Sequence, residues 1–268
     1  MNRKILIFSG IIIALVSCTR VPITGRRQMN LLPESEMMSM SLTSYRDFLS
    51  KNKTVPDADP QTELVKKVGD NIAKAVQRYM TANKKYASRV QGFKWEFNLV
   101  NDKTVNAWCM PGGKVVVYTG LLPVTQNETG LAIVMGHEIA HAIARHGNER
   151  MSQGLLVQLG GIGLAVATST KSGPTQDIFN QSYGVASTLG TLAYSRKHES
   201  EADKLGLVFM AMAGYNPSEA PAFWERMAAS SGGQKPPEIL STHPSDQTRI
   251  KDIRAFLPQA MKYYKPAN

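Results

Sequence analysis

The sequence contains only two cysteines, Cys18 and Cys109, among its 268 residues. Cys109 stands between Trp108 and Met110, and a cysteine among large apolar residues is typical of a buried small hydrophobe rather than a nucleophile. The sequence also lacks a serine, histidine and aspartate pattern that would indicate a nucleophilic hydrolase. Covalent catalysis by a side chain is therefore not indicated.

Long apolar runs are scarce as well, and the clearest one, Ile5 to Val16, follows a short basic start. About a dozen apolar residues are too few to span a bilayer, so the run predicts a signal peptide over residues 1–17. It ends in Leu15-Val-Ser-Cys18, which resembles the bacterial lipobox. That resemblance implies a lipid on Cys18 and a location in the bacterial cell envelope, at the outer membrane facing the periplasm. Because Cys109 is then the last thiol, the mature chain has no disulfide.

The charge pattern argues against a nucleic-acid partner. The formal net charge is +10, but the basic residues are scattered and are not interleaved with aromatic ones. A solvated surface near anionic lipid accounts for them better. Repeats are absent, and 43% hydrophobic residues suffice for one domain with a core. We expect a signal peptide over 1–17, a lipidated tether over 18–33 and one folded domain over 34–268.

The most informative stretch is Gly136-His-Glu-Ile-Ala-His141. Its apolar neighbours recur at helical spacing after Asn127, a residue that commonly caps helices. On such a helix His137 and His141 lie one turn apart on the same face, so both can bind one zinc ion. Glu138 is then placed to take a proton from a metal-activated water. This pattern is typical of zinc metallopeptidases.

A catalytic zinc site needs a third protein ligand. The metzincin solution would place glycine at 144 and histidine at 147, but the chain has Ala144 and Gly147. His146 is one residue out of register, and we interpret it as a histidine at the helix end. The third ligand must therefore come from another part of the chain.

The best candidate for that ligand lies in the predicted helix around residues 194–203. Glu199 and Asp203 are one helical turn apart. Glu199 can therefore bind the metal while Asp203 accepts a hydrogen bond from a ligating imidazole, which orients the ring. Glu201 points to another face, and we expect it to be an exposed carboxylate.

These motifs together carry a family resemblance. HExxH followed by Ser195-Arg-x-x-Glu-x-x-Ala-Asp203 resembles the HtpX-like and CAAX-prenyl-protease-like zinc metallopeptidases, in particular their periplasmic lipoprotein branch. The likeness continues through Asn106-Ala-Trp-Cys-Met-Pro-Gly-Gly113 and through Thr242-His-Pro244 with Arg249, and it covers most of residues 21–257. It implies one zinc per chain with Glu199 as the third ligand, in agreement with the geometric choice.

The resemblance also suggests roles for His243 and Arg249. Both would donate hydrogen bonds to the oxyanion of the tetrahedral intermediate. Alternatively, a neutral His243 could occupy the fourth zinc position and hold the enzyme inactive. A third interpretation is purely structural, with the Thr-His-Pro turn capping a helix and Arg249 pairing with Asp246 or Asp252.

The predicted fold is α+β and mainly helical, a zincin-like gluzincin domain with a small antiparallel sheet next to the HExxH helix. Alternating apolar residues predict strands over residues 93–99, 105–110 and 114–118. In the family such a sheet offers an edge to which an extended substrate adds as a strand. Asn106 and Ala107 are the candidates for that edge.

We therefore predict a zinc-dependent endopeptidase anchored to the bacterial envelope, acting by resemblance on misfolded or unassembled envelope proteins. The alternative is a lipoprotein for envelope-protein assembly, or a chaperone, with a latched or weakly active zinc site. Glu138 favours catalysis, because a purely structural zinc site has no need of a general base. Processing of CAAX prenyl peptides is disfavoured, because the membrane spans that form its chamber are missing from the sequence pattern.

Overall fold

A computed structural model describes residues 18–158, 195–229, 239–240, 243 and 247–266. The signal peptide predicted over residues 1–17 lies outside this part of the chain. Within the described ranges, no helix is both long and apolar enough to cross a membrane.

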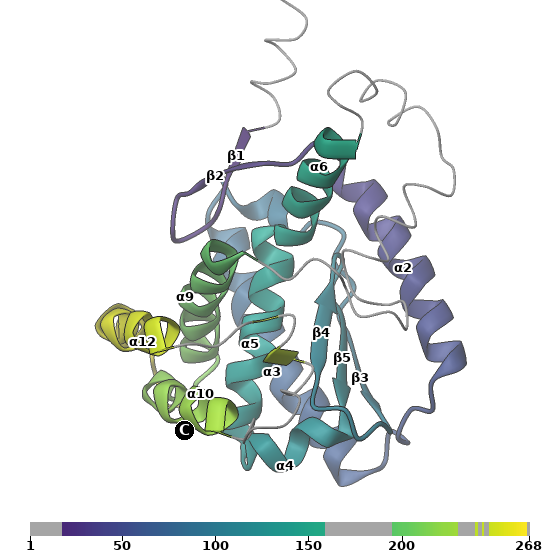
Figure 1. The fold of residues 1–268 in the computed structure, drawn as a ribbon, viewed down its shortest axis with the longest axis vertical. Coiled ribbons are helices and arrows are strands. Elements are labelled where there is room, and N and C mark those ends of the chain that lie inside the picture. Colours follow the sequence, from purple (N-terminus) through teal and green to yellow (C-terminus); the bar gives the residue numbers. More distant parts are fainter. Residues whose placement is uncertain (1–17, 159–194, 230–238, 241–242, 244–246, 267–268) are drawn as a thin grey trace, which may run out of the picture.

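Helix α5 (Glu128–Ala144) carries the HExxH motif through the middle of the molecule (Figure 1). Asn127 caps it as predicted, since its side chain accepts a hydrogen bond from the Gly130 amide at 2.7 Å. Every residue from Gly130 to Ala144 is buried, as expected for a helix that is apolar around most of its circumference. The helix ends because Arg145 adopts a left-handed conformation with φ 61°.

Other helices pack around α5. Helix α6 (His146–Gln158) follows it directly, while α3 (Pro60–Ala82) and α9 (Arg196–Met212) lie against it. Helix α12 (Gln247–Ala260) packs on α9, and α10 (Ala220–Ala229) contacts both α12 and α5. Short elements complete the described helices: α4 (Leu122–Thr125) and the 3-10 helices Ala87–Arg89, Thr119–Leu121, Pro217–Glu219 and Met261–Tyr263.

In the described part of the chain, the main sheet has three strands, β3 (Glu96–Val100), β4 (Ala107–Met110) and β5 (Lys114–Tyr118), in the order β3-β5-β4. The predicted α+β, mainly helical class is confirmed, but the sheet is mixed rather than fully antiparallel. Strands β4 and β5 pair antiparallel, whereas β3 pairs parallel to β5. A tight turn with positive φ at Gly112 and Gly113 keeps β4 beside β5. Strand β3 is therefore left with the opposite edge of β5.

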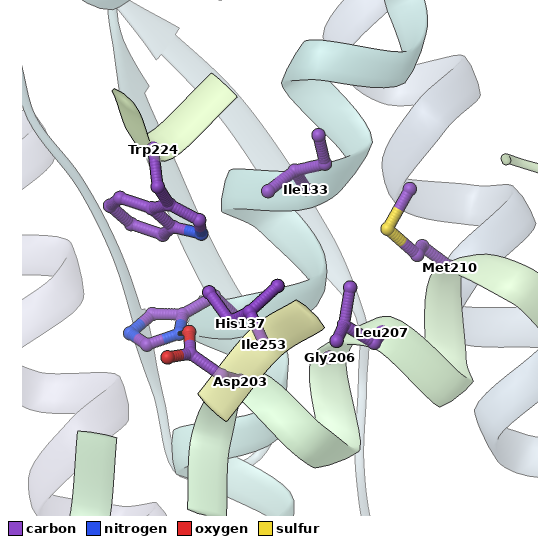
Figure 2. Close-up of a pocket in the computed structure, with 8 residues that line it drawn as sticks. All are labelled: Ile133, His137, Asp203, Gly206, Leu207, Met210, Trp224 and Ile253. Atoms are coloured by element: carbon purple, nitrogen blue, oxygen red, sulfur yellow. Dashed lines mark hydrogen bonds and ion pairs between the residues drawn. The ribbon is translucent and has the colours of Figure 1, made fainter. Parts of the chain in front are cut away.

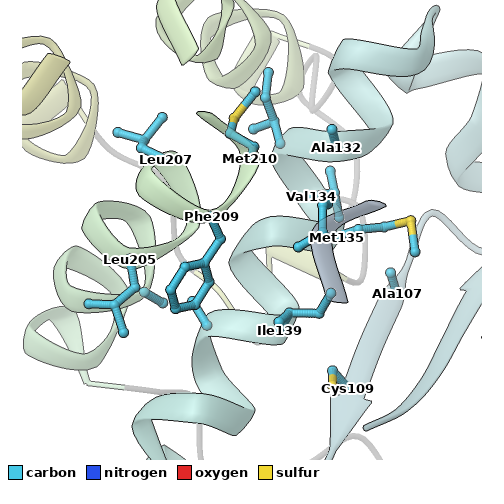
Figure 3. Packing of buried hydrophobic residues seen from close by; sticks show 14 of the residues in the cluster. Ala107, Cys109, Ala132, Val134, Met135, Ile139, Leu205, Leu207, Phe209 and Met210 are labelled. Atoms are coloured by element: carbon cyan, nitrogen blue, oxygen red, sulfur yellow. The ribbon is translucent and has the colours of Figure 1, made fainter. Parts of the chain in front are cut away.

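The two faces of the sheet belong to different clusters, because side chains alternate along a strand. Val115 and Val117 pack in the cluster that contains α5, whereas Val116 packs with helix α2 (Glu34–Lys51). Cys109 is buried with the α5 cluster, as its neighbours predicted. Figure 3 shows Ala107 and Cys109 on the strand beside the apolar side chains of α5.

Residues predicted as a tether include a two-stranded hairpin, β1 (Cys18–Arg20) and β2 (Arg27–Met29), held against the domain. Arg89 connects the two parts. Its Nη1 donates to the carbonyls of Ile143 and Ala144 at 3.1 and 3.2 Å, and its Nη2 donates to the Arg20 carbonyl at 2.7 Å. One guanidinium therefore satisfies carbonyls at the end of α5 and fixes the hairpin there.

Helices α5 and α9 cross at two glycines, Gly136 and Gly206. A Cβ atom at Gly206 would lie 2.9 Å from the His137 amide nitrogen and 3.0 Å from the Gly136 carbonyl carbon. Both neighbours are backbone atoms that cannot rotate away. The close approach of the two helices therefore requires the absence of a side chain at this crossing.

We expect Gly206→Ala to lower the free energy of unfolding by about 1–3 kcal/mol through overpacking, against a gain of up to about 1 kcal/mol in helix propensity. Thermal unfolding of the full chain measures the net loss. Gly154→Ala is the matched control, because a Cβ there meets nothing within 4 Å and only the propensity gain should remain. Equal melting temperatures for Gly206→Ala and wild type would contradict the tight crossing.

Candidate metal centre

Helices α5 and α9 bring His137, His141 and Glu199 together, and His243 completes the cluster. One ligand atom from each of the four side chains lies within 4.8 Å of the others, and all four residues are buried. The HExxH helix supplies two of them from one face, as its spacing predicted. Glu199 lies in the first turn of α9, which Ser195 caps by accepting a hydrogen bond from the His198 amide at 3.3 Å.

The spacing of these atoms fits zinc. Ligand bonds of about 2.0–2.1 Å in a tetrahedron put neighbouring ligand atoms about 3.3 Å apart. The Nε2 atoms of His137 and His141 are 3.1 Å apart, and they lie 3.3 and 3.4 Å from the Glu199 carboxylate. Glu199 Oε2 is fully buried beside His137 Nε2, and a cation between the imidazoles would bind it. Two imidazoles and a carboxylate are a donor set that zinc accepts.

The electrostatics of the cluster also favour a cation. Burial would lower the pKa of His137, but hydrogen bonds to Asp203 and Glu199 outweigh it and raise that pKa to about 9. Burial would raise the pKa of Glu199, yet the nearby His243 and hydrogen bonds with the other imidazoles hold it well below its usual value. Burial keeps the pKa of His141 well below its ordinary value, so this ring is neutral. A positive charge between these groups is therefore stabilised.

Glu138 lies beside the ligand set without belonging to it. Its side chain is buried, Oε1 has no hydrogen-bond partner in the described part of the chain, and His243 Nε2 is 3.6 Å away. Burial raises the pKa of the Glu138 carboxyl above its ordinary value. A carboxylate with a raised pKa is better matched to proton transfer near neutral pH than an exposed one.

Asp203 contacts the side of the His137 ring that faces away from the cluster. Its Oδ1 lies 2.9 Å from His137 Nδ1 and leaves Nε2 directed at the cluster. Arg249 in turn donates from Nε and Nη2 to the two oxygens of Asp203, each at 2.8 Å. The guanidinium also lies 3.7 Å from the centroid of the Trp224 ring, which packs edge-on against His137.

The hydrogen bonds of Arg249 differ from those expected for a donor to the oxyanion. Two of its nitrogens bond Asp203, and Nη1 donates to the His243 carbonyl at 3.2 Å. The partner is Asp203 on α9, not Asp246 or Asp252. Arg249 therefore neutralises Asp203 and supports the segment that carries His243.

Figure 2 shows the region behind His137, where its ring and the Asp203 carboxylate face each other below Trp224. A cavity of about 10 Å³ opens there, close to the smallest volume that holds one water molecule. Its lining is mainly apolar: Ile133, His137, Asp203, Gly206, Leu207, Met210, Trp224 and Ile253. This cavity is too small to accept a peptide.

His243 occupies a ligand position in the cluster. Its Nδ1 lies 3.0 Å from Glu199 Oε1 and 3.3 Å from His137 Nε2. Those separations are similar to the 3.1–3.4 Å between the ligand atoms of the other three residues. Of the three interpretations of His243, this geometry is compatible with that of a fourth metal ligand.

Asn106 and Ala107 stand at the start of β4, an edge strand of the three-stranded sheet. The Asn106 carbonyl accepts the Tyr118 amide at 3.1 Å, so pairing with β5 uses the inner side of the strand. The Ala107 amide donates to the Asn106 side chain at 2.9 Å instead. Strand β4 thus lies at an edge of the described sheet, and the Asn106 side chain covers the Ala107 amide.

Two residues were placed wrongly from the sequence. Glu201 was expected to be exposed, but it is only 4% exposed, and its Oε2 lies 3.0 Å from His146 Nε2. His146 does not end the zinc helix. Helix α5 ends before it, at the left-handed Arg145, and His146 is the first residue of α6. Its Nδ1 lies 3.0 Å from His141 Nδ1. Burial lowers the pKa of His146 to about 4, so the ring is neutral.

Around this pair lies a second polar group that sequence reasoning missed. Arg26 of the hairpin donates from Nε to Glu201 at 2.7 Å and from both terminal nitrogens to Glu149 at 2.7 and 2.6 Å. Glu149 also bonds His198 Nε2 at 3.1 Å, and the His198 ring stacks on His146. One signal was available: the chain has only five histidines, and four of them lie in or next to the two ligand motifs.

Comparisons with known proteins agree with this site. A family model described as Peptidase family M48 matches residues 67–257. The chain is 35% identical over 243 residues to the mitochondrial metalloendopeptidase OMA1 of Schizosaccharomyces pombe, which covers 90% of this chain and 66% of that protein. It is 29% identical over 257 residues to the human mitochondrial metalloendopeptidase OMA1, covering 92% and 47%. The beta-barrel assembly-enhancing protease of Yersinia pestis is 34% identical over 164 residues, covering 60% and 34%. The chain thus spans between about a third and two thirds of these relatives.

The comparisons correct the predicted location. Relatives matched over nine tenths of the chain, in yeast, cattle, humans and zebrafish, are named as mitochondrial. That finding contradicts a location at the bacterial outer membrane. The lipobox-like residues before Cys18 suggested this location, but a few residues around one cysteine do not determine where a protein is located.

The predicted chemistry is confirmed at the level of the family, since relatives across fungi, plants and animals are named metalloendopeptidases. The zinc prediction agrees with both the family and the His-His-Glu-His cluster. The matched segment covers well over half of the sequence and includes all four residues of that cluster, and therefore the chain belongs to peptidase family M48.

Proposed function

We propose that this chain is a zinc-dependent endopeptidase that cleaves misfolded or unassembled proteins. One observation carries the proposal: the ligand atoms of His137, His141, Glu199 and His243 converge within 4.8 Å, with the Glu138 carboxylate beside them. Zinc bound there would activate water and polarise the scissile carbonyl. The names of the relatives support peptide hydrolysis as the reaction.

Each residue of the site has a definite part in this proposal. His137, His141 and Glu199 hold the metal. Glu138 takes a proton from the attacking water and delivers it to the leaving amine. Asp203 holds His137 in the tautomer that leaves Nε2 free for the metal. The positive charge of Arg249 keeps the Asp203 carboxylate ionised.

We propose that substrate binds as an added strand along β4. Among the described residues, β4 pairs as a strand with β5 alone, while the Ile239 amide donates to the Val105 carbonyl just before β4 at 3.2 Å. An edge strand offers backbone groups to an extended peptide. Unfolded chains can adopt that extended form, whereas folded domains cannot. A backbone carbonyl of the substrate that pairs at Ala107 would replace the Asn106 side chain as the acceptor of the Ala107 amide.

We further propose that His243 is the fourth ligand of a resting state. A zinc site with four protein ligands has no position for water, and a catalytic site needs one. The distances from His243 Nδ1 to Glu199 and His137 support this role. It follows that His243 must leave the cluster before cleavage.

A second candidate function is assembly or chaperone work with little cleavage. Two observations favour it: His243 completes the ligand set, and relatives in Yersinia pestis and Vibrio cholerae are named beta-barrel assembly-enhancing proteases. Glu138 separates the candidates, because assembly alone does not require a general base.

Glu138→Gln should reduce cleavage of casein by about 100- to 10,000-fold, because it removes the general base. Zinc content should stay at the wild-type level, since Glu138 is not a ligand. The assay uses the full chain, with zinc measured by metal analysis. Glu128→Gln on the same helix is the control, and it should retain activity. Cleavage that survives in Glu138→Gln would contradict the proposed mechanism.

His243→Ala should raise casein cleavage and weaken zinc binding, because it opens the fourth position and removes one ligand. Initial rates and competition with a zinc chelator measure the two effects separately. If cleavage falls while zinc affinity stays unchanged, His243 is a hydrogen-bond donor to the substrate and the resting-state proposal is wrong.

We retain the lipid on Cys18 as a proposal, together with removal of residues 1–17. Cys18 is the first residue of β1 in the hairpin that contacts the domain, so a lipid there would hold the domain close to a membrane. Mass spectrometry of the chain purified from expressing bacteria should show a diacylglyceryl group on wild type and none on Cys18→Ser. An intact, unmodified amino terminus in wild type would contradict this proposal.

A further inference from the structure

All five histidines of the chain are buried in one continuous cluster, although the proposed metal site uses only three of them. The other two, His146 and His198, lie behind His141, on the side opposite the ligand atoms. Buried polar groups are costly unless they are bonded to one another. The group behind His141 therefore calls for a function.

We propose that His146 and Glu201 form a relay that positions the metal ligand His141, and that Arg26 and Thr24 of the amino-terminal hairpin hold this relay in place. The inference rests on the proposed zinc site. It assigns a role in that site to residues of the hairpin, which lies before the segment matched by the family model.

The relay follows from the requirements of the ligand. His141 faces the cluster with Nε2, and that atom must carry a lone pair to bind a metal. The proton of the neutral ring must therefore lie on Nδ1. Its neighbour at 3.0 Å is Nδ1 of His146, which must accept that proton as a hydrogen bond.

The same reasoning fixes the next ring. If His146 accepts at Nδ1, its own proton lies on Nε2. That atom is 3.0 Å from Glu201 Oε2, which accepts it. The order of donors is then His141 to His146 to Glu201. The Glu201 carboxylate thus sets the tautomer of the ligand His141 through the ring of His146.

The hairpin supplies the end of the relay. Glu201 accepts hydrogen bonds from Arg26 Nε at 2.7 Å and from the Thr24 hydroxyl. Arg26 also binds Glu149 with two nitrogens, so its position is fixed from two sides. Without Arg26, Glu201 would be a buried carboxylate with one fewer charged partner. Its ionised form would be less stable, and its orientation would be less fixed.

The two ligand histidines are thus oriented by different means. His137 bonds Asp203 directly, whereas His141 reaches a carboxylate only through His146. Both carboxylates lie on α9, and each is neutralised by an arginine from another part of the chain: Arg249 for Asp203 and Arg26 for Glu201.

The test is the zinc affinity of the full chain, measured by competition with a chelator. His146→Ala should weaken zinc binding by about 10- to 100-fold, the range seen when partners of metal ligands are removed. His146→Gln should stay close to wild type, because its amide can accept from His141 and donate to Glu201. A purely structural role would predict that both variants lose stability without this difference in affinity.

Variants at the hairpin extend the test away from the ligands. Arg26→Ala and Thr24→Val should each weaken zinc binding, and Arg26→Ala by more. Arg254→Ala is the matched control, because Arg254 forms an exposed ion pair with Glu225 at 2.7 Å and should leave the affinity unchanged. Melting temperatures of the zinc-free proteins show which variants fold.

Cobalt substitution gives a readout independent of activity. The visible absorption bands of bound cobalt report the ligand geometry, and they should shift in His146→Ala and return in His146→Gln. Folded variants with wild-type zinc affinity and cobalt spectra would overturn the relay. Failure of the wild type itself to bind zinc would instead overturn the proposed function, so the two failures are distinguishable.

Discussion

The burial of three neighbouring carboxylates governs the architecture of this molecule. Glu138, Glu199 and Asp203 are each at most 6% exposed, and a charge removed from water without partners costs several kcal/mol. Asp203 is neutralised by Arg249, and Glu199 lies among three imidazoles. Glu138 is the exception, and its pKa rises in response. Glu138, the carboxylate with the fewest neutralising partners of the three, is thus the one whose proposed role is to accept a proton.

The parts of the site that depend on local spacing could be predicted from the sequence. His137 and His141 share a face because they are four residues apart, and the same spacing places Glu199 and Asp203. His146 could not be placed in this way. Its position depends on the left-handed backbone conformation of Arg145. Glycine and asparagine are the residues that usually adopt this conformation, so an arginine here did not indicate that the helix ends.

Long-range partners were beyond the sequence for a different reason. Glu201 was judged from its position on an isolated helix, where a third carboxylate seemed solvent-facing. Its partner Arg26 is 175 residues away, and nothing in local periodicity connects them. The sheet shows the same limit: alternation predicted the strands, but the parallel pairing of β3 with β5 depends on how the chain crosses between them.

The two sides of the metal centre differ in what they require of the chain. The ligand atoms and the Asp203–Arg249 pair all lie within the segment that the family model matches. The support of His141, by contrast, ends at Arg26, outside that segment. A hairpin held by Arg89 at the end of α5 and by Arg26 at Glu201 is attached at two points close to one ligand. A displacement of the hairpin would therefore change the hydrogen bonds of Glu201, which the proposed relay connects through His146 to His141.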